Sequence, residues 1–386
     1  MRKTWVISAV GFLLLLAACS KKSNTAKVET IDSVTHIHCT ETPLHPEKTI
    51  IFEEELAIKE QDETGKIQLY KPSRFTVDAN DNIYISDSSD QAIKVFNRNG
   101  KYFRTIGTKG DGPGEFQSIG RITFLQDGRL LIMDWQARRT NFFNTKGEFL
   151  YSHKWRTSHF NVYLSTSSSY TVDEYVYGEK RQLLIKTYDF SGKELVSFGE
   201  FTPSGSHSYR QGNSSFSISL PYDAHSIFTG DQQQQWLYHC LNDKYLIEVY
   251  DQNGKLFRKI DRPYKPVPFT NKDAEEYWSS FGDDPNNVFA KMAKEVELPQ
   301  VKTITERLLV DDQGNLWVGT FEEKTQDGRT FSAYDIFNKD GFYDAKVWCD
   351  IRPGILVRGK MYSLVEDKET GFRTIKRYRV ISKDKS

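Results

Sequence analysis

The chain has few cysteines and no excess of charge. It contains four cysteines in 386 residues, and lysine plus arginine equal aspartate plus glutamate at 52 each. This balance gives no polybasic surface for nucleic acid, so we expect no nucleic-acid partner. The sequence also lacks a Ser nucleophile elbow and a phosphate-cradling glycine loop followed by a helix. No linker divides the chain, which favours a single domain.

Three cysteines remain beyond the N-terminal segment, and an odd number cannot all pair. Cys39, Cys240 and Cys349 each lie in or near an apolar strand run. Buried, unpaired thiols are the expectation at such positions. An exported compartment permits disulfides. Cys39 with Cys349 is the one pair we would test, because both should lie near the closing blade.

The longest apolar run lies at the N-terminus and is too short to span a membrane. Arg2 and Lys3 precede an apolar stretch from Val6 to Leu16, and small residues follow up to Cys19. The pattern predicts a signal peptide over residues 1–18. Its end resembles a bacterial lipobox, which implies acylation of Cys19, with chains such as palmitate, and stable membrane anchoring. An ordinary signal peptide with a chance cysteine is the alternative.

Residues 19–47 are polar and lack periodicity, which predicts a tether. His36 and His38 would share one face of a strand and could chelate a soft metal together with His45. No second Cys/His cluster at zinc-site spacing supports that interpretation, so we expect no metal.

The segment from Pro72 to Gly107 contains four short apolar runs separated by three turn signals. The runs are rich in Ile, Val, Phe and Tyr, which is typical of strands. Asn99-Gly100 between the last two runs is a strong hairpin signal. This segment therefore predicts a four-stranded antiparallel meander that cannot bury its own faces and needs copies of itself.

The copies follow along the chain. The hairpin glycine recurs at Gly100, Gly147, Gly192, Gly254 and Gly341. The first two spacings are 47 and 45 residues, a period typical of propeller blades. The run VDANDNIYISDSSDQAIKVFNRNGKYFRTIGTKGDGPGEF resembles an NHL repeat. Together with the lipobox, the chain resembles the six-bladed propeller lipoproteins of Bacteroidetes-type bacteria. That resemblance implies an all-β fold and location in the cell envelope, with the outer membrane as the expected membrane, but no particular activity.

The predicted architecture is an all-β, six-bladed β-propeller over residues 48–382. The last blade has only three strands before the chain ends, so Lys48–Ile58 is expected to supply its fourth, outermost strand and close the ring. Two connections are too long for simple links, 200–223 and 262–303. The second is expected to hold two short helices between blades four and five, the first capped by Asn271.

Antiparallel alternation places the outer links and the loops between second and third strands at one end of the ring. On this face we predict candidate ligand-binding residues at Asp87, Asp90, Gln91, Trp135, Arg138 and Arg139. Aromatic and guanidinium groups suit glycans, carboxylates or peptides. The favoured interpretation is a non-catalytic binding or scaffold module without a cofactor, whose partners are the membrane, through the lipid anchor, and an envelope protein, peptide or glycan.

The alternative is a metal-assisted hydrolase or lyase with its site on the propeller axis. Some six-bladed propellers with related repeats carry metal ligands there, contributed by several blades at equivalent depth. In this sequence His153, His159, His207, His225 and His239 do not recur at one blade position. The metal enzyme is therefore the less favoured hypothesis.

Overall fold

The structure is a computed structural model that describes residues 26–383 except 62, 63, 67, 156, 179, 212, 213, 283, 285 and 368. The expected signal peptide and the acylation site Cys19 lie outside the described residues. Within the described part of the chain, no helix is long and apolar enough to cross a membrane.

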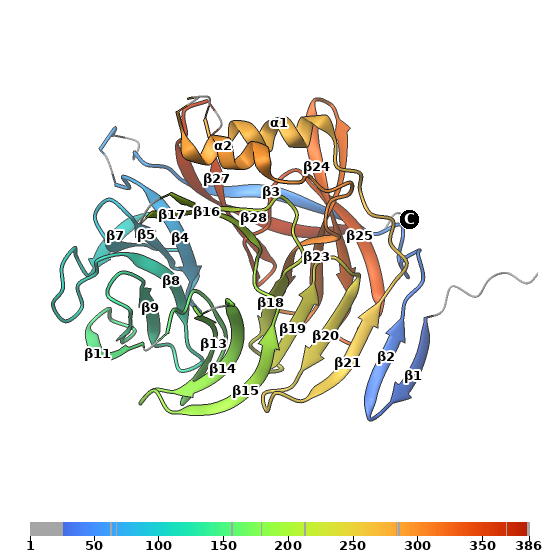
Figure 1. Ribbon diagram of the computed structural model, residues 1–386. Helices are drawn as coiled ribbons and strands as arrows, with labels where there is room; N and C mark the ends of the chain where they lie inside the picture. Colours follow the sequence, from blue (N-terminus) through green and yellow to red (C-terminus); the bar gives the residue numbers. More distant parts are fainter. Residues whose placement is uncertain are drawn as a thin grey trace, which may run out of the picture.

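Six sheets, each built on four antiparallel strands, surround a central axis, which Figure 1 shows nearly end-on. Each sheet is a blade, and the predicted six-bladed β-propeller is confirmed. Blades one and two are formed by β4 (Pro72–Val77), β5 (Ile83–Asp87), β6 (Ala92–Phe96), β7 (Tyr102–Ile106), β8 (Ile119–Phe124), β9 (Leu130–Asp134), β10 (Arg139–Phe143) and β11 (Phe149–Lys154). Blades three and four are formed by β12 (Val162–Ser165), β13 (Ser169–Val176), β14 (Gln182–Asp189), β15 (Glu194–Phe201), β18 (Ser226–Asp231), β19 (Trp236–Leu241), β20 (Leu246–Tyr250) and β21 (Leu256–Asp261). Blades five and six are formed by β22 (Thr305–Val310), β23 (Leu316–Gln326), β24 (Arg329–Phe337), β25 (Tyr343–Cys349), β26 (Ile355–Val357), β27 (Lys360–Glu366), β28 (Arg373–Lys383) and β3 (Thr49–Ile58).

The same turn joins the outer two strands of five blades. An Asn or Asp side chain at its start accepts hydrogen bonds from the N–H groups two and four residues later, and a glycine three residues later has positive φ. These pairs are Asn97 and Gly100, Asn144 and Gly147, Asp189 and Gly192, Asp251 and Gly254, and Asn338 and Gly341. Glycine reaches this conformation without a Cβ clash, which explains why the hairpin signal repeats in the sequence.

The N-terminal strand closes the ring as predicted. β3 pairs antiparallel with β28, from Thr49 opposite Lys383 to Ile58 opposite Ile375. It is the outermost strand of blade six, so the two ends of the propeller are joined in one sheet.

The segment assigned to a tether is not free of structure, and this part of the prediction needs correction. β1 (Lys27–Ile31) and β2 (Val34–His38) form a hairpin whose turn, Asp32-Ser33, has positive φ at both positions. β2 then pairs in parallel with β21 and extends blade four to six strands. Farther on, the N–H groups of Leu44 and His45 donate to the backbone carbonyls of Tyr343 and Asp344, at the start of β25. The described part of the predicted tether therefore follows the outer edge of the ring.

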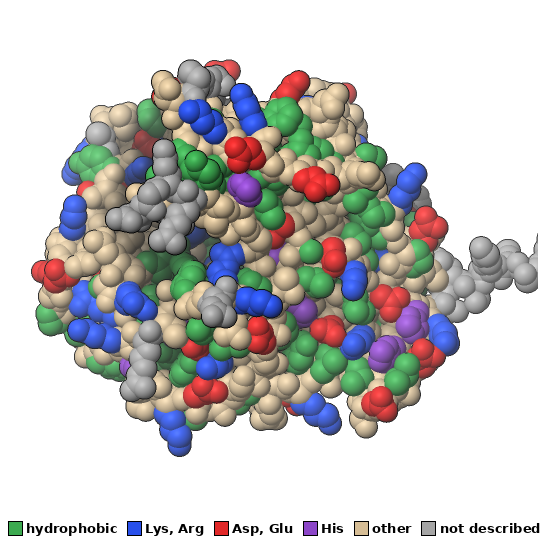
Figure 2. Space-filling model, in the orientation of Figure 1, with side chains coloured by type: hydrophobic (Ala, Val, Ile, Leu, Met, Phe, Trp, Pro, Cys, Tyr) green, Lys and Arg blue, Asp and Glu red, His purple; other side chains and the backbone are tan. Residues whose placement is uncertain are grey.

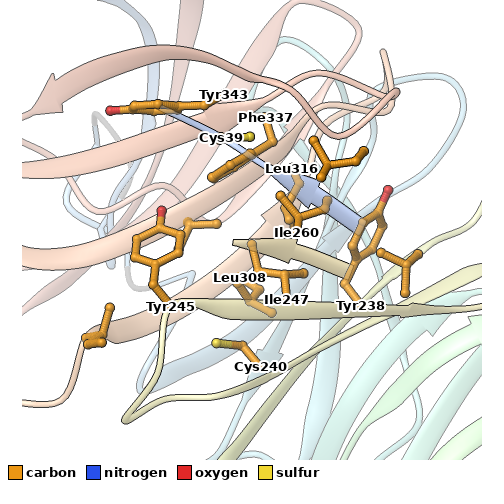
Figure 3. Close-up of a cluster of buried hydrophobic side chains, with 14 residues drawn as sticks. Cys39, Tyr238, Cys240, Tyr245, Ile247, Ile260, Leu308, Leu316, Phe337 and Tyr343 are labelled. Carbon is orange, nitrogen blue, oxygen red and sulfur yellow. The ribbon is translucent and has the colours of Figure 1, made fainter. Parts of the chain in front are cut away.

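Hydrophobic side chains pack between neighbouring blades. Six clusters occupy the six boundaries between blades. Figure 3 shows the cluster between blades four and five, in which Cys39, Cys240, Tyr238 and Phe337 are buried and Cys39 lies beside Phe337. Cys349 is buried in a different cluster, between blades five and six. All three described cysteines are unpaired, so the Cys39–Cys349 pair is absent.

Both long connections carry secondary structure. The first forms a hairpin, β16 (Ser206–Gln211) with β17 (Ser214–Ser219), and the second forms α1 (Asn271–Ser279) and α2 (Val288–Glu295). The helical insertion is as predicted, but the cap of α1 is Thr270 and not Asn271. The Thr270 hydroxyl accepts from the N–H of Asp273, whose carboxylate accepts from the N–H of Thr270, a reciprocal arrangement that Asn271 cannot make.

Candidate ligand-binding site

Four of the innermost strands contain a β-bulge near their first residues. The pairing register shifts between Pro72 and Arg74 in β4, and equivalent shifts occur between Ile119 and Ile122, Val162 and Leu164, and Thr305 and Arg307. A bulge releases a residue from the ladder and re-aims its side chain. The repeated bulge therefore marks one end of the axial channel, the end that also receives both long connections.

A cavity of about 290 Å³ opens at this mouth of the channel, between blades three, four and five. The bulge residues Tyr163 and Glu306 line it, together with Asn161, Asp173 and His225. Figure 2, viewed as in Figure 1, shows a hollow near the middle of the ring with Lys and Arg side chains beside it. Polar and charged groups thus surround the channel mouth.

The carboxylates at this cavity already have partners. Asp173 accepts hydrogen bonds from the backbone N–H groups of Phe160 and Asn161, the Asn161 amide and the Tyr163 hydroxyl. Burial raises the pKa of the Asp173 carboxyl, although these bonds oppose the shift. Glu306 forms an ion pair with Arg352 at 2.5 Å.

Two arginines at the channel mouth lack such partners. Among the interactions of the described residues, the Arg121 guanidinium has no hydrogen bond or ion pair, and that of Arg74 lies only over the Trp135 ring, 5.8 Å from its centroid. Both side chains are exposed. Even so, the surrounding protein desolvates Arg121 and, with the nearby charge of Arg74, lowers its pKa, while Tyr163 and Asp173 oppose the shift. The Arg121 side chain is therefore accessible to solvent and yet surrounded by protein atoms, which places it in a recess.

Trp135 forms part of the wall beside these arginines. Its indole packs against Gly120, where a Cβ atom would lie 2.3 Å from the indole Nε1. Glycine at this position therefore allows the ring to approach the innermost strand of blade two. Trp135 also contacts Phe160 edge-to-face, with ring centroids 5.8 Å apart.

Comparison with known proteins identifies the fold. A profile of the family DUF5128, described as a 6-bladed beta-propeller, matches residues 63–191, and one described as a two component regulator propeller matches residues 298–322. No curated protein matches the chain. The chain is a six-bladed β-propeller.

Solved structures resemble this propeller at low identity. An exported protein from Bacteroides fragilis has 11% identity and a TM-score of 0.50, covering 91% of this chain and 100% of its own. A member of the DUF4221 family from Bacteroides vulgatus has 8% identity and a TM-score of 0.54, covering 87% of this chain and 99% of its own. The virginiamycin B lyase from Staphylococcus aureus has 11% identity and covers 86% of this chain and 100% of its own, but its TM-score of 0.43 supports no argument about activity.

Asp87, the first of the predicted ligand-face residues, is buried in the propeller. Its carboxylate accepts hydrogen bonds from the backbone N–H groups of Tyr70, Lys71 and Ser89. Asp134 accepts equivalent bonds from the link that precedes blade two. An acid at the end of the second strand thus holds the incoming link of its blade, and this gives Asp87 a structural role.

Asp90 and Gln91 also have partners within the fold. Asp90 pairs with Lys94 at 2.6 Å, and the Gln91 side chain accepts from the N–H of Ile119 at 2.8 Å. The second contact links blade one to blade two.

The two predicted arginines beside Trp135 are engaged as well. Arg139 donates to the backbone carbonyls of Asp111 and Glu115, and its Nε lies 3.7 Å from Asp134. Arg138 has a φ of 50° in the turn and is not free of interactions. Of the six predicted residues, Trp135 is the one in contact with an unpaired arginine, and ligand contact by the other five stays a prediction.

Arg74 and Arg121 were missed although the sequence contains a signal for them. They occupy matching places in two repeats, Ser-Arg-Phe-Thr-Val at 73–77 and Gly-Arg-Ile-Thr-Phe at 120–124. A charged residue recurring inside an otherwise apolar innermost strand points to the channel. That both arginines lack acidic partners could not be predicted, because it depends on the blades that face them.

Of the three histidines considered for a metal, His36 and His38 lie together, with ring centroids 6.2 Å apart, whereas His45 contacts other residues. Nowhere among the described residues do three or more His, Cys, Asp or Glu side chains form a group that could hold a metal ion. His38 contacts Asp261 at 2.8 Å and Glu29 at 3.1 Å, and these hydrogen bonds, Asp261 first, raise its pKa. His45 instead faces Glu47 and Asp344.

Proposed function

We propose that this propeller is an exported binding module of the bacterial envelope, anchored through Cys19 and binding its ligand at the channel mouth. The lipobox-like sequence before Cys19 supports the anchor. The structural likeness to an exported Bacteroides protein is consistent with this location. NHL-type repeats, acylation and sorting to the outer membrane are parts of the same proposal.

The observation that carries the binding role is the cavity at the mouth of the channel, on the face that receives both insertions. The β16–β17 hairpin and α2 pack together through Ile218, Met292, Ala293 and Val296. The Tyr277 hydroxyl on α1 also donates to the Ser219 carbonyl. In Figure 1 the hairpin extends across the open centre of the ring. A rigid ring with a recessed, partly covered site is a common arrangement for small-ligand binding.

The anchor is tested by replacing Cys19. Because acyl chains attach to this thiol, we expect Cys19→Ala to be released from the membrane fraction or to accumulate unprocessed. Fractionation and the mass of the mature chain measure both outcomes. A variant that stays membrane-bound and is processed as before contradicts the lipobox interpretation.

The binding role is tested with a screen of glycans, peptides and small metabolites against the full-length chain in detergent. We expect Trp135→Ala to abolish binding of the hits, because Trp135 forms the wall beside Arg74. Trp236→Ala is a matched control, since Trp236 lies at the opposite end of its strand from the channel mouth and stacks with Arg258. The comparison is valid if both variants melt at the temperature of the parent chain, because loss of binding then does not reflect loss of folding. If Trp135→Ala still binds the hits, the binding site lies elsewhere on the ring.

A further inference from the structure

We infer that the ligand carries an anionic oxygen group, a carboxylate or a phosphate, which Arg74 and Arg121 bind at the channel mouth. This inference rests on the proposed binding function and names the chemical class of its ligand. Neither arginine is among the ligand-binding residues predicted from the sequence.

The balance of charge at the channel mouth favours an anion. The nearby carboxylates are occupied, Asp173 by four hydrogen bonds and Glu306 by Arg352. Arg74 and Arg121 are close enough to repel one another electrostatically, and neither has an acidic partner among the described residues. Asp173 offsets part of this repulsion, but two like charges without a paired acid remain unfavourable for the folded state unless something binds them. An anion removes this repulsion.

The geometry is that of a prepared site and not of two loose surface side chains. Arg74 lies at the bulge of β4 and Arg121 within the bulge of β8, and these two innermost strands are adjacent in the ring. The Trp135 ring backs Arg74 from the side. A guanidinium offers paired N–H donors that match the oxygens of a carboxylate or phosphate. Two such groups on rigid strands can hold one anionic group from two sides.

The adjoining cavity limits the size and character of the ligand. Arg121 interacts electrostatically with Tyr163 and Asp173, both of which line the cavity. At about 290 Å³ the cavity is at the small end of ligand sites. Tyr175, Leu183 and Phe228 add apolar surface to its wall. The ligand is therefore a small organic anion, and not a polymer threaded through the channel.

Isothermal titration of the full-length chain in detergent tests the inference. The probes are inorganic phosphate, D-glucuronate and citrate, with D-glucose as the neutral match for glucuronate. We expect at least one anion to bind with 1:1 stoichiometry, more weakly as salt rises, and glucose not to bind. Tight binding of phosphate alone would identify a phosphate group, and binding of the carboxylates alone would identify a carboxylate.

Variants locate the binding. Arg121→Gln is expected to raise the Kd by about tenfold or more, because it removes a charge-assisted hydrogen-bond donor. Arg121→Lys keeps the charge but loses the paired N–H donors of the guanidinium, so its Kd should lie between those of the parent chain and Arg121→Gln. Arg98→Gln is the matched control, an exposed arginine in a hairpin turn at the opposite end of blade one. Equal binding by Arg121→Gln and Arg98→Gln overturns the inference.

Stability provides an independent reading. Without ligand, Arg121→Gln should melt at the same temperature as the parent chain or roughly 1–2 °C higher, because it removes a repulsive charge. A clear loss of stability would mean that Arg121 is a structural residue, and this overturns the inference. The inference is also overturned if none of the anionic probes binds in the titration. If the screening hits are neutral compounds lost in Trp135→Ala, the anion inference fails and the binding function stands, whereas a screen without hits removes both.

Discussion

Deleting residues 48–58 is expected to abolish the cooperative unfolding transition of the whole propeller. Without β3, blade six keeps only three strands and β28 becomes an open edge. Ile58 is fully buried, and Ile50, Phe52 and Leu56 pack against the clusters on both sides of blade six. Burial of one large aliphatic side chain contributes roughly 1.5–3 kcal/mol. Together these losses approach the whole stability of about 5–15 kcal/mol typical of a folded domain.

Thermal and denaturant unfolding followed by circular dichroism measure this effect. The matched control deletes residues 26–33, which removes β1 and its turn. Among the described strands β1 pairs with β2 alone, and it is mostly exposed, so this variant should keep a cooperative transition with a modest shift. If the 48–58 deletion melts cooperatively at the parent midpoint, β3 does not hold the ring closed.

Much of the fold could be predicted because its information is local. Five of the six blades contain a tight turn whose Asx residue and glycine can be recognised within five residues, as in Asn97 to Lys101. Once the unit is known, the number of copies and the strand missing from the last blade follow from counting. Closure by β3 was therefore predictable although its partner lies more than 300 residues away.

The features that were missed depend on non-local contacts. The β1–β2 hairpin turns at Asp32-Ser33, which lacks the usual glycine, and β2 is fixed by parallel pairing with β21 far along the chain. The candidate site shows the same limit. Trp135 was predicted from its residue type, whereas the recess around Arg121 forms only when four bulged innermost strands face one axis.

Arg262 and Asp335 form the most deeply buried ion pair described in the chain, and its loss is the second large effect that we expect. The Asp335 side chain is fully buried and that of Arg262 is 3% exposed. Arg262 Nε and Nη2 both donate to Asp335, at 3.1 and 2.5 Å. The hydroxyls of Tyr245 and Tyr343 donate to the same carboxylate at 2.6 and 2.7 Å. Burial alone would lower the pKa of Arg262, but Tyr245 and Asp335 outweigh it and raise that pKa.

Arg262→Met should lower the free energy of unfolding by roughly 3–5 kcal/mol, because it leaves the buried Asp335 charge with only the more distant Lys346, at 3.8 Å, as a cationic partner. Arg379→Met is the matched control, since Arg379 pairs with Glu53 and Glu55 at an exposed site, where loss of a pair costs about 0–1 kcal/mol. Chemical denaturation measures both values. The double variant Arg262→Met/Asp335→Asn should be less destabilised than Arg262→Met, because it removes the charge left behind.

This pair lies where the 262–303 insertion leaves blade four. It joins Arg262, the first residue of the insertion, to Asp335 in the third strand of blade five. Arg262 also stacks between Tyr245 and Tyr343, whose ring centroids lie 4.6 and 4.7 Å away. Its removal should therefore loosen the base of the insertion as well as the boundary between the blades. Hydrogen exchange of α1 and α2 in Arg262→Met tests this step, and we expect faster exchange there than in Arg379→Met. Equal exchange in the two variants would mean that the insertion is held by its own contacts with the β16–β17 hairpin.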